Sequence, residues 1–263
     1  FSFTNIKKIF IPKNVECIGA EAFKRCVHLK SVVFDQQSVL KTIHESAFYD
    51  TMITELKLPG SIQNLEKKWS FGMKKLKELS FTSPNDYYQI LDNKIVIGKS
   101  KYLFESDFNE NKNDDSFDVL CCVTNKIEEI KIPSYIKYIY PFAFSYCKKL
   151  QHVSFENDSK LEKMCEESFS FSSINSIFIS KNVKLVDKSC FRSCKNLSKV
   201  EFDPDSKAFL EDFSFENTKI KGIIIPKFVT GSTYNLFGYS ESLISIELLG
   251  DEIEDNYSWF NIN

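Results

Sequence analysis

Phenylalanines recur along this chain at a nearly constant spacing. Successive members of the series lie 22 to 25 residues apart, except across one gap of 73 residues, which is about three periods. A period of 20 to 50 residues is typical of a solenoid, in which each repeat is one coil that buries its apolar face only against neighbouring coils. We therefore expect a stack of roughly ten coils instead of a globular core. The Phe column consists of Phe23, Phe48, Phe71, Phe144, Phe169, Phe191, Phe215 and Phe237.

An apolar triplet follows each column Phe, as in Leu29, Val32 and Phe34. The last two members stand two residues apart, and this alternation predicts a short strand with one buried face. Two forms of the repeat take turns. One form has Cys three residues after the Phe, as at Cys26, whereas the strand of the other often ends in Pro, as at Pro59. The natural unit is therefore a pair of coils.

A small residue often precedes the column Phe, and we expect it to let neighbouring coils stack closely on the outer side, where a helical turn would run. The residues concerned are Ala22, Ala47, Ser168, Cys190 and Ser214.

Two runs of the sequence carry a family resemblance. The segments 9–23 (IFIPKNVECIGAEAF) and 130–144 (IKIPSYIKYIYPFAF) resemble BspA-like leucine-rich repeats, whose pattern is I-x-I-P-x-x-V-x-x-I-x-x-x-A-F-x-x-C-x-x-L-x-x-V-x-F. The resemblance implies an α/β, β-rich solenoid: a leucine-rich repeat superhelix with a parallel sheet on the concave side and short helical turns on the convex side. It extends over nearly the whole chain, so we expect residues 1–263 to form a single array. Departures from the pattern at Phe71 and Phe237 predict local irregularity.

The ends of the chain and its long gap need separate interpretations. Phe1 fits the Phe column, so the chain begins within a coil, and we expect it to be a fragment of a longer protein. Residues 84–118 form an insertion, which begins with a predicted hairpin turning at Asp92-Asn93. Its second part, 105–115, is rich in Asn and Asp and is expected to be mobile. The insertion is either a binding loop or a tolerated surface excursion.

Composition and charge exclude several classes of function. Lys and Arg number 34 and Asp and Glu 36, so the net charge of −2 provides no basic field for nucleic acid. No stretch is apolar enough to span a bilayer.

The eight cysteines do not determine the redox compartment. Those at equivalent repeat positions (Cys26, Cys147 and Cys194) are interpreted as small buried hydrophobic residues. Cys17, Cys121 and Cys122 remain as possible reactive or paired thiols, and no C-x-x-C motif suggests zinc.

The sequence contains no recognisable catalytic constellation. The three histidines belong to different coils without convergent partners, and the glycine spacing offers no phosphate cradle. We therefore expect no catalytic residue, no cofactor and no metal site.

The remaining candidate site is the exposed side of the strand sheet, where residues vary without harming the core. Phe10, Phe178 and Ile224 stand out there because exposed apolar residues on a polar sheet anchor partners. The alternative is that they merely cover the sheet beside neighbouring strands. The candidate partner-binding residues are Phe10, Val33, Lys57, Lys131, His152, Phe178, Glu201, Ile224 and Glu247.

These observations favour a non-catalytic protein-binding module. By resemblance to BspA-like proteins, which occur on mucosal bacteria and parasitic protists, it would be a cell-surface or secreted adhesin. Its partner would be a host matrix protein or a cell-surface protein, bound through the repeat sheet. The alternative is a cytoplasmic leucine-rich repeat scaffold or regulatory protein, and the sequence assigns no oligomeric state.

Overall fold

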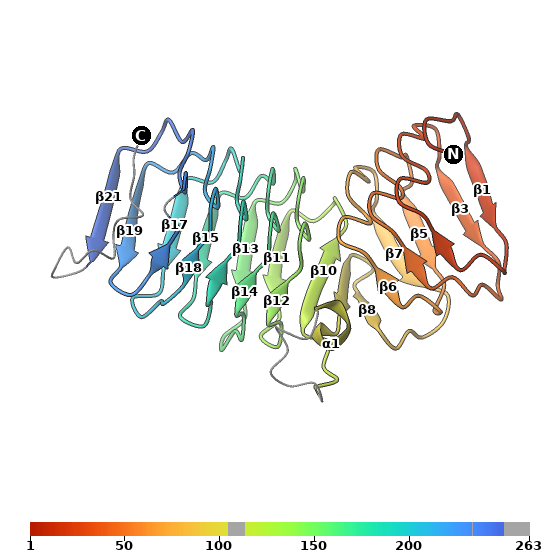
Figure 1. Cartoon of the computed structure of the whole chain (residues 1–263), viewed down its shortest axis with the longest axis horizontal. Helices are drawn as coiled ribbons and strands as arrows, with labels where there is room; N and C mark the ends of the chain where they lie inside the picture. Colours follow the sequence, from red (N-terminus) through yellow and green to blue (C-terminus); the bar gives the residue numbers. More distant parts are fainter. Residues whose placement is uncertain (105–113, 233, 250–263) are drawn as a thin grey trace. The chain divides into compact units, whose positions relative to one another are not determined.

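The computed structural model describes residues 1–104, 114–232 and 234–249. The chain forms two compact units, Phe1–Lys126 (unit 1) and Ile127–Asn263 (unit 2). Within each unit, successive coils contribute a long strand of four or five residues and a short strand of two residues (Figure 1). The predicted solenoid with parallel sheets is confirmed. That both units belong to one continuous array stays a prediction.

The long strands carry the alternation that the sequence predicts. In β5 the side chains of Leu56 and Leu58 are buried, whereas Glu55 and Lys57 are exposed. The long strands of unit 1 are β1 (Lys8–Ile11), β3 (Ser31–Phe34), β5 (Glu55–Leu58) and β7 (Glu78–Phe81). Those of unit 2 are β11 (Glu129–Ile132), β13 (His152–Phe155), β15 (Ser176–Ile179), β17 (Lys199–Phe202), β19 (Gly222–Pro226) and β21 (Ser245–Leu249).

Hydrogen bonding joins the long strands two by two, which matches the predicted pairing of coils. The parallel pairs are β1–β3, β5–β7, β11–β13, β15–β17 and β19–β21. After the second strand of a pair, the next residue donates to the preceding coil, as Asp35 N–H does to Ile11 O at 3.0 Å. The corresponding residue after β5 is Pro59, which has no N–H to donate. Proline thus prevents this bond at β5, whereas β15 is followed by Ser180 and the ladder is interrupted there without a proline.

The short strands form longer parallel ladders on a second side of each unit. Their inward residue is the apolar position that precedes the column Phe by five residues, as at Ile18 and Ile43. Unit 1 contains β2 (Cys17–Ile18), β4 (Thr42–Ile43) and β6 (Asn64–Leu65), and unit 2 contains β12 (Tyr138–Ile139), β14 (Lys163–Met164), β16 (Leu185–Val186), β18 (Phe209–Leu210) and β20 (Thr230–Gly231).

The outer side is built from turns, so the prediction of short helical turns there is wrong. The described residues contain one α-helix, α1 (Ser100–Leu103). Residues two before and two after the column Phe adopt left-handed backbone, for example Glu21 (φ 57°) and Arg25 (φ 55°). Such residues break the helical hydrogen-bond pattern. Local turn bonds, such as that from Lys24 N–H to Glu21 O at 3.0 Å, alternate with bonds between coils. For example, the N–H of Phe23 donates to Ala47 O at 2.8 Å, and that of Arg25 donates to Tyr49 O at 2.7 Å.

The column rings stack face to face along each unit. In unit 1 the ring of Phe23 lies 5.5 Å from Phe1 and 5.4 Å from Phe48 between centroids. In unit 2 the corresponding distances along Phe144, Phe169, Phe191, Phe215 and Phe237 are 4.7, 5.1, 5.3 and 5.7 Å. The small residues before the rings are fully enclosed where they are Ala47, Ser168, Cys190 or Ser214. This confirms the close stacking predicted from them.

Phe71 does not occupy the column position, so this assignment from sequence is wrong by one residue. The left-handed residues of its coil are Lys68 (φ 64°) and Gly72 (φ 75°), which place Ser70 at the column position. The Phe71 ring stacks instead on Tyr49, the residue after column Phe48, with a centroid distance of 5.5 Å. Trp69, at the position usually held by a small residue, is only 3% exposed and fills the core.

The described part of the 84–118 insertion belongs to the core of unit 1. Strands β8 (Tyr88–Leu91) and β9 (Ile95–Gly98) form an antiparallel hairpin around Asp92-Asn93, and β10 (Val119–Val123) pairs antiparallel with β9. The buried Tyr88 hydroxyl accepts a hydrogen bond from the N–H of Leu65 at 2.9 Å, which satisfies a donor of β6. Most of the loop expected to be mobile, residues 105–113, lies outside the described residues.

Candidate functional site

The candidate site consists of the outward side chains of the long strands, which we call the sheet face. In unit 1 it includes Phe10 on β1, Val33 on β3 and Lys57 on β5, all exposed. Phe10 and Val33 are Cα partners in the parallel pair, and their side chains are 53% and 38% exposed. They form an apolar pair on neighbouring strands, at positions where the alternation of the strand turns them away from the core.

In unit 2 the sheet face contains one predicted residue from each long strand, and all six are exposed. Phe178 lies opposite Glu201, and Ile224 lies opposite Glu247, as Cα partners. Each exposed apolar side chain is therefore next to a carboxylate. The six residues are Lys131 on β11, His152 on β13, Phe178 on β15, Glu201 on β17, Ile224 on β19 and Glu247 on β21.

One of these carboxylates has a neighbour of opposite charge on its own strand. Lys199 Nζ lies 2.8 Å from Glu201 Oε1, with both side chains more than half exposed. Exposed ion pairs are worth about 0–1 kcal/mol, so a partner displaces this one at little cost. The arrangement suits a ligand that presents apolar groups beside basic ones.

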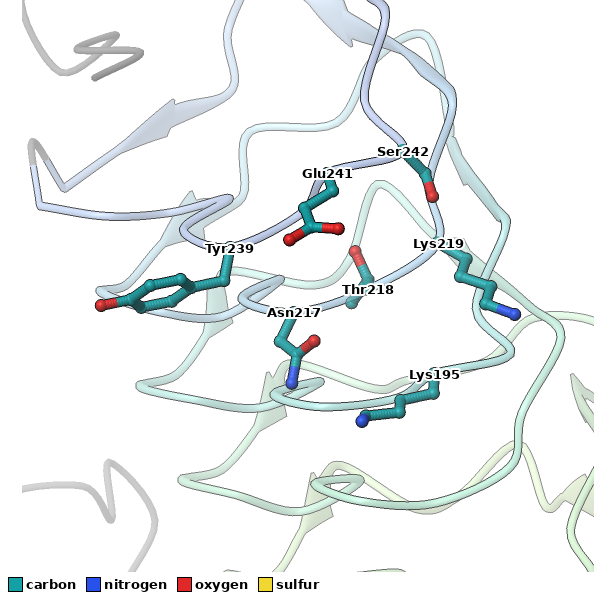
Figure 2. A pocket seen from close by; sticks show the side chains of 7 residues that line it. All are labelled: Lys195, Asn217, Thr218, Lys219, Tyr239, Glu241 and Ser242. Atoms are coloured by element: carbon teal, nitrogen blue, oxygen red, sulfur yellow. The ribbon is translucent and has the colours of Figure 1, made fainter.

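Unit 2 also has a polar pocket that the sequence did not indicate (Figure 2). It has a volume of about 520 Å³ and lies at the junction of the outer turns and the following chain segments of the last described coils. The lining residues come from three successive coils: Lys195; Asn217, Thr218 and Lys219; and Tyr239, Glu241 and Ser242. Sequence analysis missed the pocket because its three groups of residues begin 22 positions apart, at Lys195, Asn217 and Tyr239. Only the stacking of successive coils brings the groups together.

All eight cysteines are unbridged, and only Cys17 is exposed. Cys121 and Cys122, considered as possible reactive or paired thiols, are buried in β10. Burial raises the pKa of Cys122 to about 12, and hydrogen bonds to Ser70 and Trp69 oppose this rise only in part. Burial also raises the pKa of Cys121 well above its ordinary value. Because the thiolate is the reactive form, neither thiol is activated in the folded protein.

Two further features of the described residues bear on function. They contain no cluster of three or more His, Cys, Asp or Glu side chains placed to hold a metal ion. Among the same residues, no helix has the length and apolar character needed to cross a membrane.

Solved structures share the fold of this chain. The pneumococcal vaccine antigen PcpA aligns with a TM-score of 0.64 at 19% identity, over 95% of this chain and 53% of that one. A leucine-rich cell surface protein from Faecalibacterium prausnitzii aligns with a TM-score of 0.62 at 16% identity, over 98% of this chain and 63% of that one. A leucine-rich repeat protein from Eubacterium ventriosum gives a TM-score of 0.59 at 16% identity, over 92% of this chain and 75% of that one. The chain thus spans between half and two thirds of the first two structures.

The family model for the BspA type leucine-rich repeat region matches residues 1–94 and 118–244 in six copies. No curated protein matches the sequence. The matched ranges contain every long strand described above except β21, together with the column rings, and leave out most of the insertion. The chain therefore belongs to the BspA-type leucine-rich repeat family.

Proposed function

We propose that this protein is a non-catalytic adhesin, placed at the cell surface or secreted, which binds a host matrix or cell-surface protein through its sheet face. The observation that carries the proposal is that each unit exposes apolar side chains on the outward side of its long strands, among mainly polar neighbours. Phe10, Phe178 and Ile224 are 53%, 43% and 52% exposed. Burying such side chains against a partner releases about 25 cal/mol for each Å² of apolar surface removed from water.

Family membership supports an interaction role, because leucine-rich repeat arrays use their variable sheet residues for partners. The cell-surface placement rests on the family and on the similarity to the Faecalibacterium prausnitzii protein, which is a leucine-rich cell surface protein. Many weak contacts along the long strands would supply the affinity, since the strands fix the backbone before binding and leave only the side chains to be ordered.

A specific observation also favours the second candidate, an intracellular scaffold or regulatory protein. None of the eight cysteines is bridged, and unbridged thiols are more common in reducing compartments. The two candidates use the same sheet chemistry, so the compartment separates them.

The first experiment determines the compartment. Antibody labelling of intact, unpermeabilised cells that is removed by protease treatment is the expected result. Labelling that requires permeabilisation would overturn the adhesin proposal and favour the scaffold.

The second experiment tests the sheet face. Binding to an array of extracellular matrix proteins and to host epithelial cells is compared between the unmodified protein and the variant Phe178→Ser/Ile224→Ser. We expect the variant to lose about tenfold or more in affinity, because it removes two anchors at once. The matched control is Phe228→Ser, which changes a residue that is 54% exposed but lies outside the long strands. Equal losses in the two variants, or no loss in either, would contradict binding through the sheet face.

A further inference from the structure

We propose that the polar pocket of unit 2 is a sugar-binding site, separate from the sheet face, which takes one hydroxyl-rich pyranose unit of a glycan. The pocket is defined by Lys195, Asn217, Thr218, Lys219, Tyr239, Glu241 and Ser242 (Figure 2). Its volume of about 520 Å³ lies within the range of small-molecule sites. Pockets for apolar ligands are lined mainly by hydrophobic side chains. The only aromatic side chain in this lining is Tyr239, and the other residues are polar.

The floor of the pocket is preorganised. Thr218 is 4% exposed, and its hydroxyl donates to Phe215 O at 3.0 Å and lies 3.3 Å from Ser240 Oγ. Asn217 is fixed at both ends: its backbone N–H donates to Gly238 O at 2.8 Å, and its Nδ2 donates to Ser193 Oγ at 3.0 Å. The Asn217 Oδ1 is thereby held in one orientation in which it accepts a hydrogen bond from a ligand hydroxyl.

The charged residues of the pocket are available to a ligand. Among the described residues, Lys195, Lys219 and Glu241 form no ion pair with one another or with other side chains. The two lysine side chains extend in opposite directions in Figure 2, and the Glu241 carboxylate lies on the Tyr239 side of Thr218. The lysine ammonium groups donate hydrogen bonds and the Glu241 carboxylate accepts them, so the pocket presents both donors and acceptors to a ligand. A sugar hydroxyl, which donates and accepts at once, uses both.

Tyr239 supplies an unusual aromatic surface. It has left-handed backbone (φ 55°), as do the residues at the same position of every regular coil. At two such positions in the same unit, the rings of Tyr146 and Phe171 stack at 4.7 Å and are covered by Lys148, which lies 5.3 and 5.9 Å from the two centroids. Among the described residues none covers the Tyr239 ring in this way, and Tyr239 is 81% exposed.

The left-handed backbone belongs to the repeat, so the exposure of its ring is what distinguishes Tyr239 and makes it available to a ligand. The face of an aromatic ring is electronegative. It attracts the polarised C–H groups on the apolar face of a pyranose. Tyr239 would thus hold one face of the sugar, while Asn217 and Glu241 bind its hydroxyl edge.

The test is saturation-transfer NMR on the whole chain, with glucose, galactose, N-acetylglucosamine and glucuronate as separate probes. We expect at least one probe to show transfer, and the variants Tyr239→Ala and Glu241→Gln each to weaken its binding about tenfold. Binding of the uronate alone would show that the lysines select an acidic sugar, whereas binding of the hexoses would show neutral recognition. The matched control is Tyr135→Ala, an exposed tyrosine of the same unit outside the pocket.

Absence of transfer for all four probes, or binding that both pocket variants leave unchanged, would overturn the proposal. Circular dichroism of each variant checks that it is folded. The Phe178→Ser/Ile224→Ser variant should bind the sugar as the unmodified protein does. This outcome separates the pocket from the sheet face, so that either proposal fails without the other.

Discussion

The coil around Phe191 in unit 2 and the coil around Ser70 in unit 1 share a backbone design but fill it differently. In both, left-handed residues flank the column position by two on each side: Ser189 and Ser193 in the first, Lys68 and Gly72 in the second. Phe191 is fully buried between two other column rings. Around Ser70 the neighbouring Trp69 supplies the buried aromatic volume instead.

This difference shows that the outer turn, and not the aromatic ring, sets the length of the repeat. Outer-turn backbone groups bond from coil to coil whichever side chain stands at the column, as Asp50 N–H does to Gly72 O at 3.2 Å. Gly72 suits its place for a second reason, because a Cβ there would lie 2.4 Å from the Tyr49 ring. The side chains then need only fill the volume that the turns enclose, by a ring at the column position or by one beside it.

The largest effect is expected where the ring stack is regular. Phe191→Ala removes a fully buried ring between two stacked neighbours and should lower the free energy of unfolding by about 4 kcal/mol. Urea denaturation followed by circular dichroism measures this change. The control, Phe178→Ala on the sheet face, should change stability by less than about 0.5 kcal/mol. Similar losses in both variants would mean that the column does not carry the core.

A somewhat smaller loss is expected at the shifted coil. Trp69→Ala should cost about 3 kcal/mol, because it empties a site that is 3% exposed. The double variant Trp69→Ala/Ser70→Phe places a small residue and a ring where the regular coils have them. It should recover about 1 kcal/mol or more of the loss. A double variant less stable than Trp69→Ala would show that this coil cannot accept the regular filling.

The hairpin next to this coil provides the third test. Tyr88→Phe keeps the buried ring but removes the hydroxyl that accepts from the Leu65 N–H. The unsatisfied buried donor should cost about 2 kcal/mol in the denaturation experiment. The matched control is Tyr102→Phe, since Tyr102 is 52% exposed and should tolerate the change. If the two variants have the same free energy of unfolding, the hydrogen bond from Leu65 N–H to the Tyr88 hydroxyl does not stabilise the fold.

The smallest effect is the dependence of the free energy of unfolding on pH. We expect it to be similar near the shifted coil and in the regular coils. Burial raises the pKa of Cys122 near the shifted coil and of Cys194 in the regular coils from 9.0 to about 12. Since the folded-state pKa lies above the unfolded one, each thiol contributes its full stability below pH 9 and loses it as the pH rises toward 12. Ionisation of each thiol in the unfolded chain should lower the free energy of unfolding by about 1 kcal/mol between pH 9 and pH 10.

Denaturation at several pH values checks this, with Cys194→Ala as the comparison. The variant should show a pH slope that is shallower by the contribution of one thiol. An unchanged slope would mean that the Cys194 thiol ionises as easily in the folded protein as in the unfolded one.

Most of the repeat was predictable because its signals are local. The buried face of each long strand follows from period-2 alternation, and the close stacking follows from the small residues before the rings, as at Ala47 and Ser168. The misplacement of Phe71 shows the limit of this reasoning. Phe71, two residues after Trp69, fits the spacing as well as a column residue does, and backbone conformation alone distinguishes Ser70 as the true position. Outer turns were expected, but their left-handed backbone was missed for the same reason, since no residue type there marks it.

The sequence by itself determined that this chain is a solenoid, which residues it buries and which strand positions face outward, because each of these follows from a pattern that every coil repeats. Only the tertiary structure decided what distant coils build together. The hairpin joins the core because Tyr88 reaches Leu65 across 23 residues, and the polar pocket exists because three coils bring Lys195, Asn217 and Tyr239 to one place. Contacts of this kind depend on coil-to-coil packing, which spacing along the chain does not specify.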